Sequence, residues 1–402
     1  MLDDNLDALN EAALNALITD RAAESTTMDF KATAHDKSEA GKVELAKDIC
    51  AFANADGGDL ILGVSSKNYV AASIAPITSE PFDALVRRYS ETLNARAEPR
   101  IHGLRFKEVR LAAGGYAAVV RVPSSYDGPH SVRATQELRR FVIRNGTSIS
   151  DMSFEQIRGA FDRTATLAER ANEIIRQRLE DIAARRTPTP IMGNGPVWVL
   201  HLVPLAGVGG RMQADLRAIH EKSFVNYLGK DWGGGSRTFN FDGLAIHPGG
   251  KSVDGYDAYA HVFRNGAIEH ASIGGDKQQV QQGGPERSIV WSLPMSKFFW
   301  ESATVSLKEL RAMGFSGPAL MSIALLTARG FELGIGNVFH RFSRGVADRL
   351  NFVVPPTWIE SLETVNLSEA LRPMLDSLWQ AFDVARCLDF DEGTGKYSPR
   401  AR

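Results

Sequence analysis

Three charged side chains near the N-terminus have types and spacing that suit chemistry. In the stretch ESTTMDFK, Glu24 and Asp29 stand five positions apart, and Lys31 follows two positions later. Two carboxylates beside an ammonium group can hold a divalent metal ion, contact a nucleic acid, or form the polar ends of an ordinary strand. The spacing alone leaves these three alternatives open, so the elements that position the residues have to be considered.

Hydrophobic periodicity predicts the elements around these residues. Apolar residues at helical spacing predict helices over 6–18, 37–53, 82–93 and 166–186, and Ser153 with Gln156 forms a capping box that opens a short helix. Strands are predicted over 27–33 and 59–64, in a hairpin at 104–123, and over 137–145 before a turn at Asn145 and Gly146. Asp29 and Lys31 therefore lie on a strand that is followed by a helix.

The second half of the chain begins after the proline-containing stretch RTPTP at 186–190. Alternating or apolar runs predict strands over 196–205, 256–266 and 267–273, and late helices over 302–314, 317–330 and 367–382. We expect an α+β fold with four parts: an N-terminal mixed sheet-and-helix domain over 1–162, a charged linker helix and break over 163–190, a C-terminal α+β domain over 191–390, and a disordered tail over 391–402.

Composition excludes several classes of protein. The formal net charge is −2, the two cysteines form no CxxC motif, and the nine histidines form no HExxH motif, so neither a cysteine zinc cluster nor a polycation is expected. Apolar runs are too short for a membrane helix, which predicts a soluble cytoplasmic protein without membrane contact. The stretch GGKS at 249–252 lacks the first glycine of a P-loop, because Ala245 stands there, so no ATP site is predicted. His201, His261 and His270 are interpreted as strand residues rather than ligands.

Three blocks in the first half carry a family resemblance. The runs ESTTMDFK, ELAKDICAFANADGGDLILGV and SYDGPHSVRATQELRRFVIRNGTSISDMS, taken together, resemble the AlbA-type domain of Schlafen proteins over residues 10–160. The resemblance implies nucleic-acid binding, and some members are metal-dependent endonucleases that cut tRNA-like RNA with three carboxylates. It assigns Glu24 and Asp29 to two of these carboxylates, with Mg²⁺ or Mn²⁺ as the metal, and Lys31 to the catalytic lysine.

The sequence departs from the family at the third carboxylate. This acid is expected two residues beyond Val64, where Ser66 stands instead. Asp59, at the start of the same predicted strand, is about 20 Å too far along it to replace the missing acid. Losing one charged oxygen ligand weakens the binding of a hard cation, so the resemblance leaves open whether the centre is active.

Basic residues gather between positions 81 and 150, where twelve Lys or Arg face six Asp or Glu. A local excess of this size predicts a phosphate-binding face. The predicted nucleic-acid contacts share a positive charge and lie within the family-like region: Lys31, Lys47, Arg87, Arg88, Arg105, Lys107, Arg139, Arg140 and Arg144.

Two functional hypotheses follow. The first is a nucleic-acid-binding, Schlafen-like, metal-dependent endonuclease acting on RNA or single strands in defence against phage, with a homodimer rebuilding the two-lobed clamp of vertebrate relatives. The second is a catalytically inactive DNA-binding transcriptional regulator whose C-terminal domain senses a signal. Ser66 is the residue that separates them, because it stands where the nuclease needs an acid.

Overall fold

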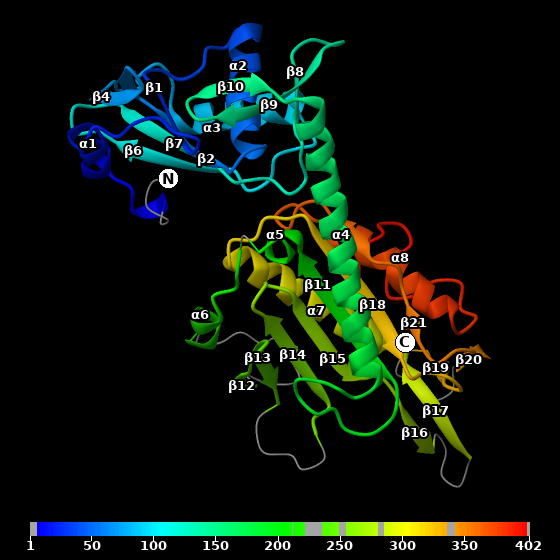
Figure 1. Ribbon diagram of the computed structural model, residues 1–402. Coiled ribbons are helices and arrows are strands. Elements are labelled where there is room, and N and C mark those ends of the chain that lie inside the picture. The colour runs from blue at the N-terminus through cyan, green and yellow to red at the C-terminus, as the bar shows by residue number, and fades with distance from the viewer. Residues whose placement is uncertain are drawn as a thin grey trace. The chain divides into compact units, whose positions relative to one another are not determined.

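The computed structural model describes residues 6–210, 212–221, 235–248, 255–279, 285–335 and 342–399. The chain divides into two compact units, Met1–Thr166 and Leu167–Arg402 (Figure 1). Both contain helices and sheets, which confirms the α+β class. The division falls inside one long helix, α4 (Phe154–Ala183), where the sequence predicted a short helix and a separate linker helix. No helix in the described parts of the chain combines the length and apolarity that crossing a bilayer needs.

In its described residues, the N-terminal unit contains ten strands, four short to medium helical segments and the first part of α4. The helical segments are η1 (Leu6–Ala8), α1 (Glu11–Thr19), α2 (Glu39–Ala53) and α3 (Phe82–Arg96). The strands are β1 (Met28–Lys31), β2 (Gly58–Leu62), β3 (Val64–Lys67), β4 (Val70–Ile74), β5 (Ala97–Glu98), β6 (Arg105–Arg110), β7 (Tyr116–Val122), β8 (Ser131–Arg133), β9 (Arg139–Asn145) and β10 (Ser148–Asp151). They form two four-stranded sheets, ordered β1-β2-β7-β6 and β10-β9-β8-β5, and the hairpin β3-β4.

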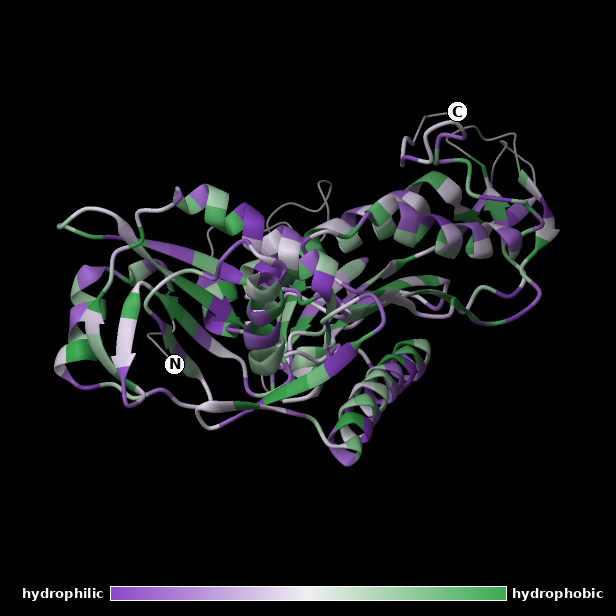
Figure 2. Cartoon of the chain, turned by 90° about the horizontal axis from the view of Figure 1, so that it is seen from above, coloured by the Kyte–Doolittle hydropathy of each residue, from purple (hydrophilic) through white to green (hydrophobic). Residues whose placement is uncertain are grey.

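Helix α2 joins the two sheets through a shared core. Ser38 caps its N-terminus by accepting from Gly41 N, and its buried face carries Leu45, Ile49 and Phe52. These side chains pack with residues of β2, β7, β8, β9 and α3 in one hydrophobic cluster. A second cluster lies between η1, α1 and the other face of β1, β2 and β7. The two inner strands, β2 and β7, are therefore covered on both faces and are largely hydrophobic (Figure 2).

Local turn signals in the N-terminal unit are confirmed. The predicted hairpin is β6-β7, the turn at Asn145 and Gly146 joins β9 to β10, and Ser153 and Gln156 bond each other's backbone N–H as a capping box. The run after β2 differs from a single long strand, because Gly63 adopts φ +88° and redirects the chain into β3.

The C-terminal unit contains four further helices and twelve strands in the described residues. The helices are α5 (Leu205–Val208), α6 (Leu216–Glu221), α7 (Ser292–Ala312) and α8 (Leu367–Gln380). The strands are β11 (Val197–Pro204), β12 (Ser236–Phe239), β13 (Gly243–His247), β14 (Ala258–Phe263), β15 (Ile268–Ile273), β16 (Asp276–Gln279), β17 (Glu286–Trp291), β18 (Ala319–Leu326), β19 (Glu332–Gly334), β20 (Phe342–Val346), β21 (Phe352–Val353) and β22 (Thr357–Ile359). The main sheet runs β12-β13-β14-β15-β11-β18-β21, with β22 also on β18, and a second sheet runs β16-β17-β19-β20.

Two predictions for the C-terminal unit are wrong. Residues 317–330 were expected to form a helix, but they contain β18, an interior strand of the main sheet with every residue buried. A short apolar run that is buried on all sides carries no alternation, so periodicity cannot separate the two structures. The expected disordered tail is ordered as far as position 399, where Tyr397 stacks on Trp300 with ring centroids 4.3 Å apart. The rejected P-loop stretch at 249–252 lies outside the described residues.

Candidate nucleic-acid-binding site

Glu24 and Ser66 are brought together by the β3-β4 hairpin. The backbone N–H of Glu24 donates to Tyr69 O at 2.7 Å, which holds Glu24 beside the hairpin. Ser66 Oγ then donates to Glu24 Oε1 at 2.9 Å. The position where the family resemblance expects a third acid therefore does lie next to the first carboxylate, and a neutral hydroxyl occupies it.

Asp29 is held differently, by a buried arginine from the second sheet. Arg144 donates to Asp29 Oδ1 at 3.0 Å and also to the backbone oxygens of Ser25 and Met28, while its guanidinium lies 4.7 Å from the Phe52 ring centroid. The side chains of Arg144 and Asp29 are only 1% and 6% exposed. The prediction that Arg144 contacts a phosphate does not fit this burial, because its donors face the protein interior.

Lys31 connects Asp29 to a second buried carboxylate that the sequence did not single out. Its Nζ lies 3.1 Å from Asp29 Oδ2 and 3.4 Å from Asp48 Oδ2 on α2. His35 Nε2 also contacts Asp48 Oδ2 at 3.0 Å, and His35 Nδ1 contacts the hydroxyl of Tyr89. Tyr89, His35, Asp48, Lys31, Asp29 and Arg144 thus form one continuous polar chain through the unit.

The electrostatics of this chain favour its charged form. Burial opposes the charge of Lys31, but the carboxylates of Asp48 and Asp29 outweigh that effect and raise the pKa of Lys31. For Asp48, burial alone would raise the pKa, but the contacts with His35 and Lys31 prevail and lower it. Lys31 therefore serves as the resident cation between two carboxylates.

The residues present do not fit a preformed divalent-metal centre. Asp29 already faces two cationic side chains, Glu24 bonds to Ser66, and no contact joins the two carboxylates within the described residues. Across the same residues, no three His, Cys, Asp or Glu side chains are arranged to hold a metal ion. Mg²⁺ and Mn²⁺ need oxygen ligands whose charge is not neutralised by other cations.

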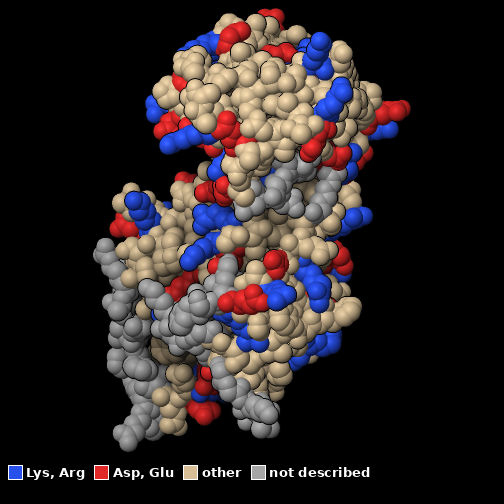
Figure 3. Space-filling model, turned by 90° about the vertical axis from the view of Figure 1, so that its left-hand side faces the viewer, with Lys and Arg blue, Asp and Glu red and all other residues tan. Residues whose placement is uncertain are grey.

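Most of the predicted phosphate contacts are exposed or half-buried, and they are already bonded to acidic residues. Arg88 binds Glu80, Arg105 and Lys107 reach Asp7, Lys47 binds Glu44 and Arg140 binds Asp151 through both nitrogens. Over 1–166 the sequence has 20 Lys or Arg and 23 Asp or Glu, a difference of −3. The excess seen between 81 and 150 is thus offset by acids from the rest of the unit, and acidic and basic side chains are interspersed on the face drawn in Figure 3.

One exposed cluster on β5, β8 and β9 has more basic than acidic groups. Arg133 and Arg139 face each other across β8 and β9, and both bind the same carboxylate oxygen of Glu98 on β5. The two arginine side chains are 46% and 42% exposed. Arg139 was predicted as a contact; Arg133 was not, because strand pairing alone brings it beside Arg139. Arg87 is exposed and has no ion-pair partner in the described part of the chain.

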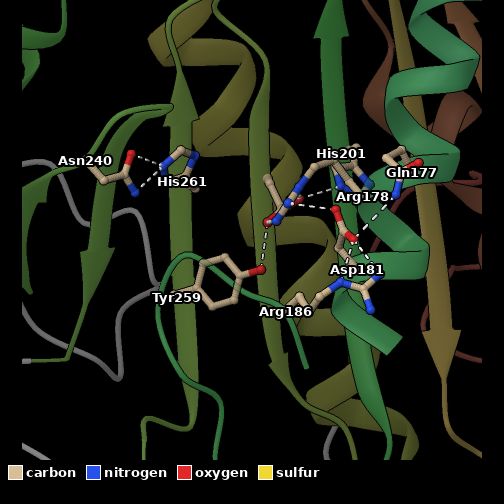
Figure 4. A network of polar contacts seen from close by, with 9 residues as sticks. Gln177, Arg178, Asp181, Arg186, His201, Asn240, Tyr259 and His261 are labelled. Atoms are coloured by element: carbon tan, nitrogen blue, oxygen red, sulfur yellow. Dashed lines mark hydrogen bonds and ion pairs between the residues drawn. The ribbon is translucent and has the colours of Figure 1, made fainter. Parts of the chain in front are cut away.

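The C-terminal unit holds a separate buried charge network (Figure 4). Glu269 on β15 accepts hydrogen bonds from Arg178 of α4, from Tyr259 and from His201. Burial would raise the pKa of Glu269, yet the bonds from His201 and Arg178 outweigh burial and lower it strongly. As predicted, His201, His261 and His270 are all strand residues.

Strand register gives this network the appearance of a hydrolase triad. His201 lies opposite Glu269 on one side and Ser322 on the other. Ser322 and Glu269 are 0% exposed and His201 is 2% exposed, so no substrate reaches the hydroxyl. The network anchors the second half of α4 to the main sheet instead.

The fold and the polar chain together define an α+β domain with a buried charged centre. Residues 24–153, from the first carboxylate to the capping serine, match the family model described as Schlafen, AlbA_2. This part of the N-terminal unit is therefore similar to the Schlafen AlbA_2 family. No curated protein matches the chain. A crystal structure of the DIP2311 protein from Corynebacterium diphtheriae is 18% identical over 35% of this chain and 29% of that one, with a TM-score of 0.25. A similarity at this level defines neither fold nor function.

Proposed function

We propose that the N-terminal unit binds nucleic acid without cleaving it. The observation that carries this proposal is the position of Lys31, whose ammonium group lies between Asp29 and Asp48 and within 3.4 Å of each. A carboxylate that faces both Lys31 and the buried Arg144 has little remaining charge with which to hold a divalent ion. Ser66 adds no charge beside Glu24. The unit thus combines similarity to a nucleic-acid-binding family with a neutralised centre.

Arg133 and Arg139 are the proposed phosphate contacts. Exposed ion pairs contribute at most about 1 kcal/mol, so a phosphate can replace Glu98 between the two guanidinium groups. Only a few contacts of this kind are available on a unit whose charges nearly balance. We therefore expect weak binding, with a salt dependence of log K on log salt of about −1 to −2 for single strands.

Fluorescence anisotropy with labelled single-stranded RNA, single-stranded DNA and duplex DNA tests the binding. Replacing both Arg133 and Arg139 by Gln is expected to weaken binding about tenfold, since two phosphate contacts are lost. The matched control is Arg140→Gln on the same strand, because Arg140 is paired one-to-one with Asp151. No binding by the unaltered protein at low salt, or equal losses in both variants, would contradict the proposal.

The same nucleic acids, incubated with and without Mn²⁺, test the absence of cleavage. Intact RNA and DNA are the expected products. Metal-dependent cutting that disappears in Glu24→Gln would overturn the non-cleaving part and favour the endonuclease. Glu24 is the appropriate site for this variant because it is half-buried at a hairpin, whereas Asp29 is buried in an ion pair with Arg144.

A further inference from the structure

The C-terminal unit contains a cavity of about 930 Å³, a size that suits a small-molecule site. It lies where the start of β11, the end of β15 and the first turns of α7 meet. The described residues that line it fall between 192 and 331, within this unit. It is separate from the polar chain of the N-terminal unit and from the buried Glu269 network.

Aromatic side chains form one wall. Trp198 and Phe298 line the cavity with ring centroids 5.7 Å apart and planes tilted by 38°, and Phe331 lines it as well. The indole of Trp198 lies against the backbone at Gly274, where an added Cβ would stand 2.7 Å from Trp198 Nε1. The lack of a side chain at Gly274 therefore lets the indole take this position. A wall of this kind favours a flat aromatic group.

The cavity also presents unused hydrogen-bonding groups. Trp198 is 8% exposed, yet its buried Nε1 has no hydrogen-bond partner among the described residues. This N–H is covered by the backbone at Gly274 and does not reach the cavity, so the indole offers a ligand its ring face rather than its N–H. Glu301 and Asp257, both half-buried, line the cavity and make no ion pair within the described residues. The cavity thus offers two carboxylates as hydrogen-bond acceptors.

Helix α7 presents charges of both signs on one side. Lys297 and Glu301 are four residues apart, so they are neighbours on one helix face, and both line the cavity together with Phe298. Lys277, on β16, adds a second ammonium group. An anionic ligand alone would face the carboxylates, and a cationic ligand alone would face the lysines. A ligand that carries both charges meets complementary groups.

We propose that this cavity binds a zwitterionic aromatic molecule: a free aromatic amino acid or the terminal residue of a short peptide. The ligand's carboxylate contacts Lys297, its ammonium contacts Glu301, and its ring lies against Trp198 and Phe298. The proposal concerns the C-terminal unit alone and does not depend on nucleic-acid binding by the N-terminal unit.

Isothermal titration calorimetry on the full chain tests the charges with four indole probes. L-Tryptophan carries both charges, tryptamine only the cation, indole-3-propionate only the anion, and indole neither. L-Tryptophan is expected to bind at least about tenfold more tightly than the other three, since it alone makes both charged contacts. Equal affinity for all four, tighter binding by a singly charged probe, or no heat from any of them at millimolar concentration would overturn the proposal.

Variants in α7 assign the contacts. Glu301→Gln should weaken L-tryptophan and tryptamine but leave indole-3-propionate unchanged, and Lys297→Gln should do the reverse. Lys308→Gln, an exposed position in the same helix, is the matched control and should change none of them. If Lys308→Gln weakens binding as much as the other two variants do, the measured heat does not report contacts with Glu301 and Lys297, and the assignment fails. Two dipeptides distinguish a peptide terminus from a free amino acid. Tryptophylglycine moves the carboxylate away from the tryptophan residue, and glycyltryptophan moves the ammonium group away from it.

Discussion

The hydroxyl of Ser66 donates a hydrogen bond to the carboxylate of Glu24 across 2.9 Å. Ser66 stands where the family resemblance expects a third acid. The contact shows that this position lies beside the carboxylate of Glu24. Ser66→Asp is therefore expected to create a pair of adjacent carboxylates and to raise Mn²⁺ affinity at least about tenfold, because a charged oxygen ligand replaces a neutral one. Calorimetric titration with Mn²⁺ measures the change. Ser66→Asn is the control for size, and an equal gain in that variant would contradict the explanation by charge.

Arg144 and Arg140 allow a matched comparison of buried and exposed ion pairs on one strand. Arg144→Met leaves Asp29 buried beside Lys31 alone and should destabilise the N-terminal unit by about 3 kcal/mol or more. Arg140→Met removes an exposed pair with Asp151 and should cost less than about 1 kcal/mol. Hydrogen exchange of β1 and β9 amides measures both. Similar protection in the two variants would show that the Arg144 pair contributes no more than a surface pair.

The buried His261 makes the stability of the C-terminal unit depend on pH. Burial lowers the pKa of His261 to about 4, from an ordinary value of 6.5. The unfolded chain therefore binds a proton at pH 5 that the folded unit does not, so stability is present above pH 6.5 and is lost as pH falls towards 4. The expected loss between pH 7 and pH 5 is about 2 kcal/mol.

Tryptophan fluorescence during urea unfolding reports this loss, because the six tryptophans all lie at or after position 198. His261→Gln keeps a partner for Asn240 and should flatten the dependence between pH 7 and pH 5. His220→Gln, on the exposed side of α6, should leave the dependence in place. A slope that survives in His261→Gln would assign the effect to another group.

A homodimer remains a prediction from the resemblance. One chain has one region that matches the Schlafen AlbA_2 family model, and a two-fold pair of chains would supply two. Light scattering after gel filtration is expected to give twice the chain mass of 43.9 kDa. A monomer at micromolar concentration would remove the two-lobed clamp from consideration.

Sequence patterns predicted the local elements well where side chains and turns act over short distances. The capping box at Ser153, the hairpin β6-β7 and the turn at Gly146 all depend on residues within a few positions of each other. The strand β18 was predicted as a helix because its eight residues are all buried, which removes the alternation that identifies a strand.

The candidate site shows the limit of the same reasoning. The family resemblance predicted that position 66 belongs to the same site as Glu24, and the hydrogen bond between Ser66 and Glu24 agrees with this. Asp48 lies in the run ELAKDICAFANADGGDLILGV, but the sequence did not identify it as a site residue. Only the tertiary fold brings α2 against Lys31. The excess of basic residues holds only for positions 81–150. Acids that neutralise some of these residues, such as Glu80 and Asp7, lie before residue 81 and are brought near by the fold.

Helix α4 is bonded to each unit at a different point along one continuous helix of 30 residues. Thr164 donates to backbone oxygens at Tyr126 and Gly128, and Arg178 binds Glu269, fourteen positions later. Each bond lies within its own unit, so Thr164 ties the first part of α4 to the N-terminal unit and Arg178 ties its second part to the C-terminal unit. A residue inserted between these two anchors would leave both bonds intact, and its cost would fall on the stretch of helix between them.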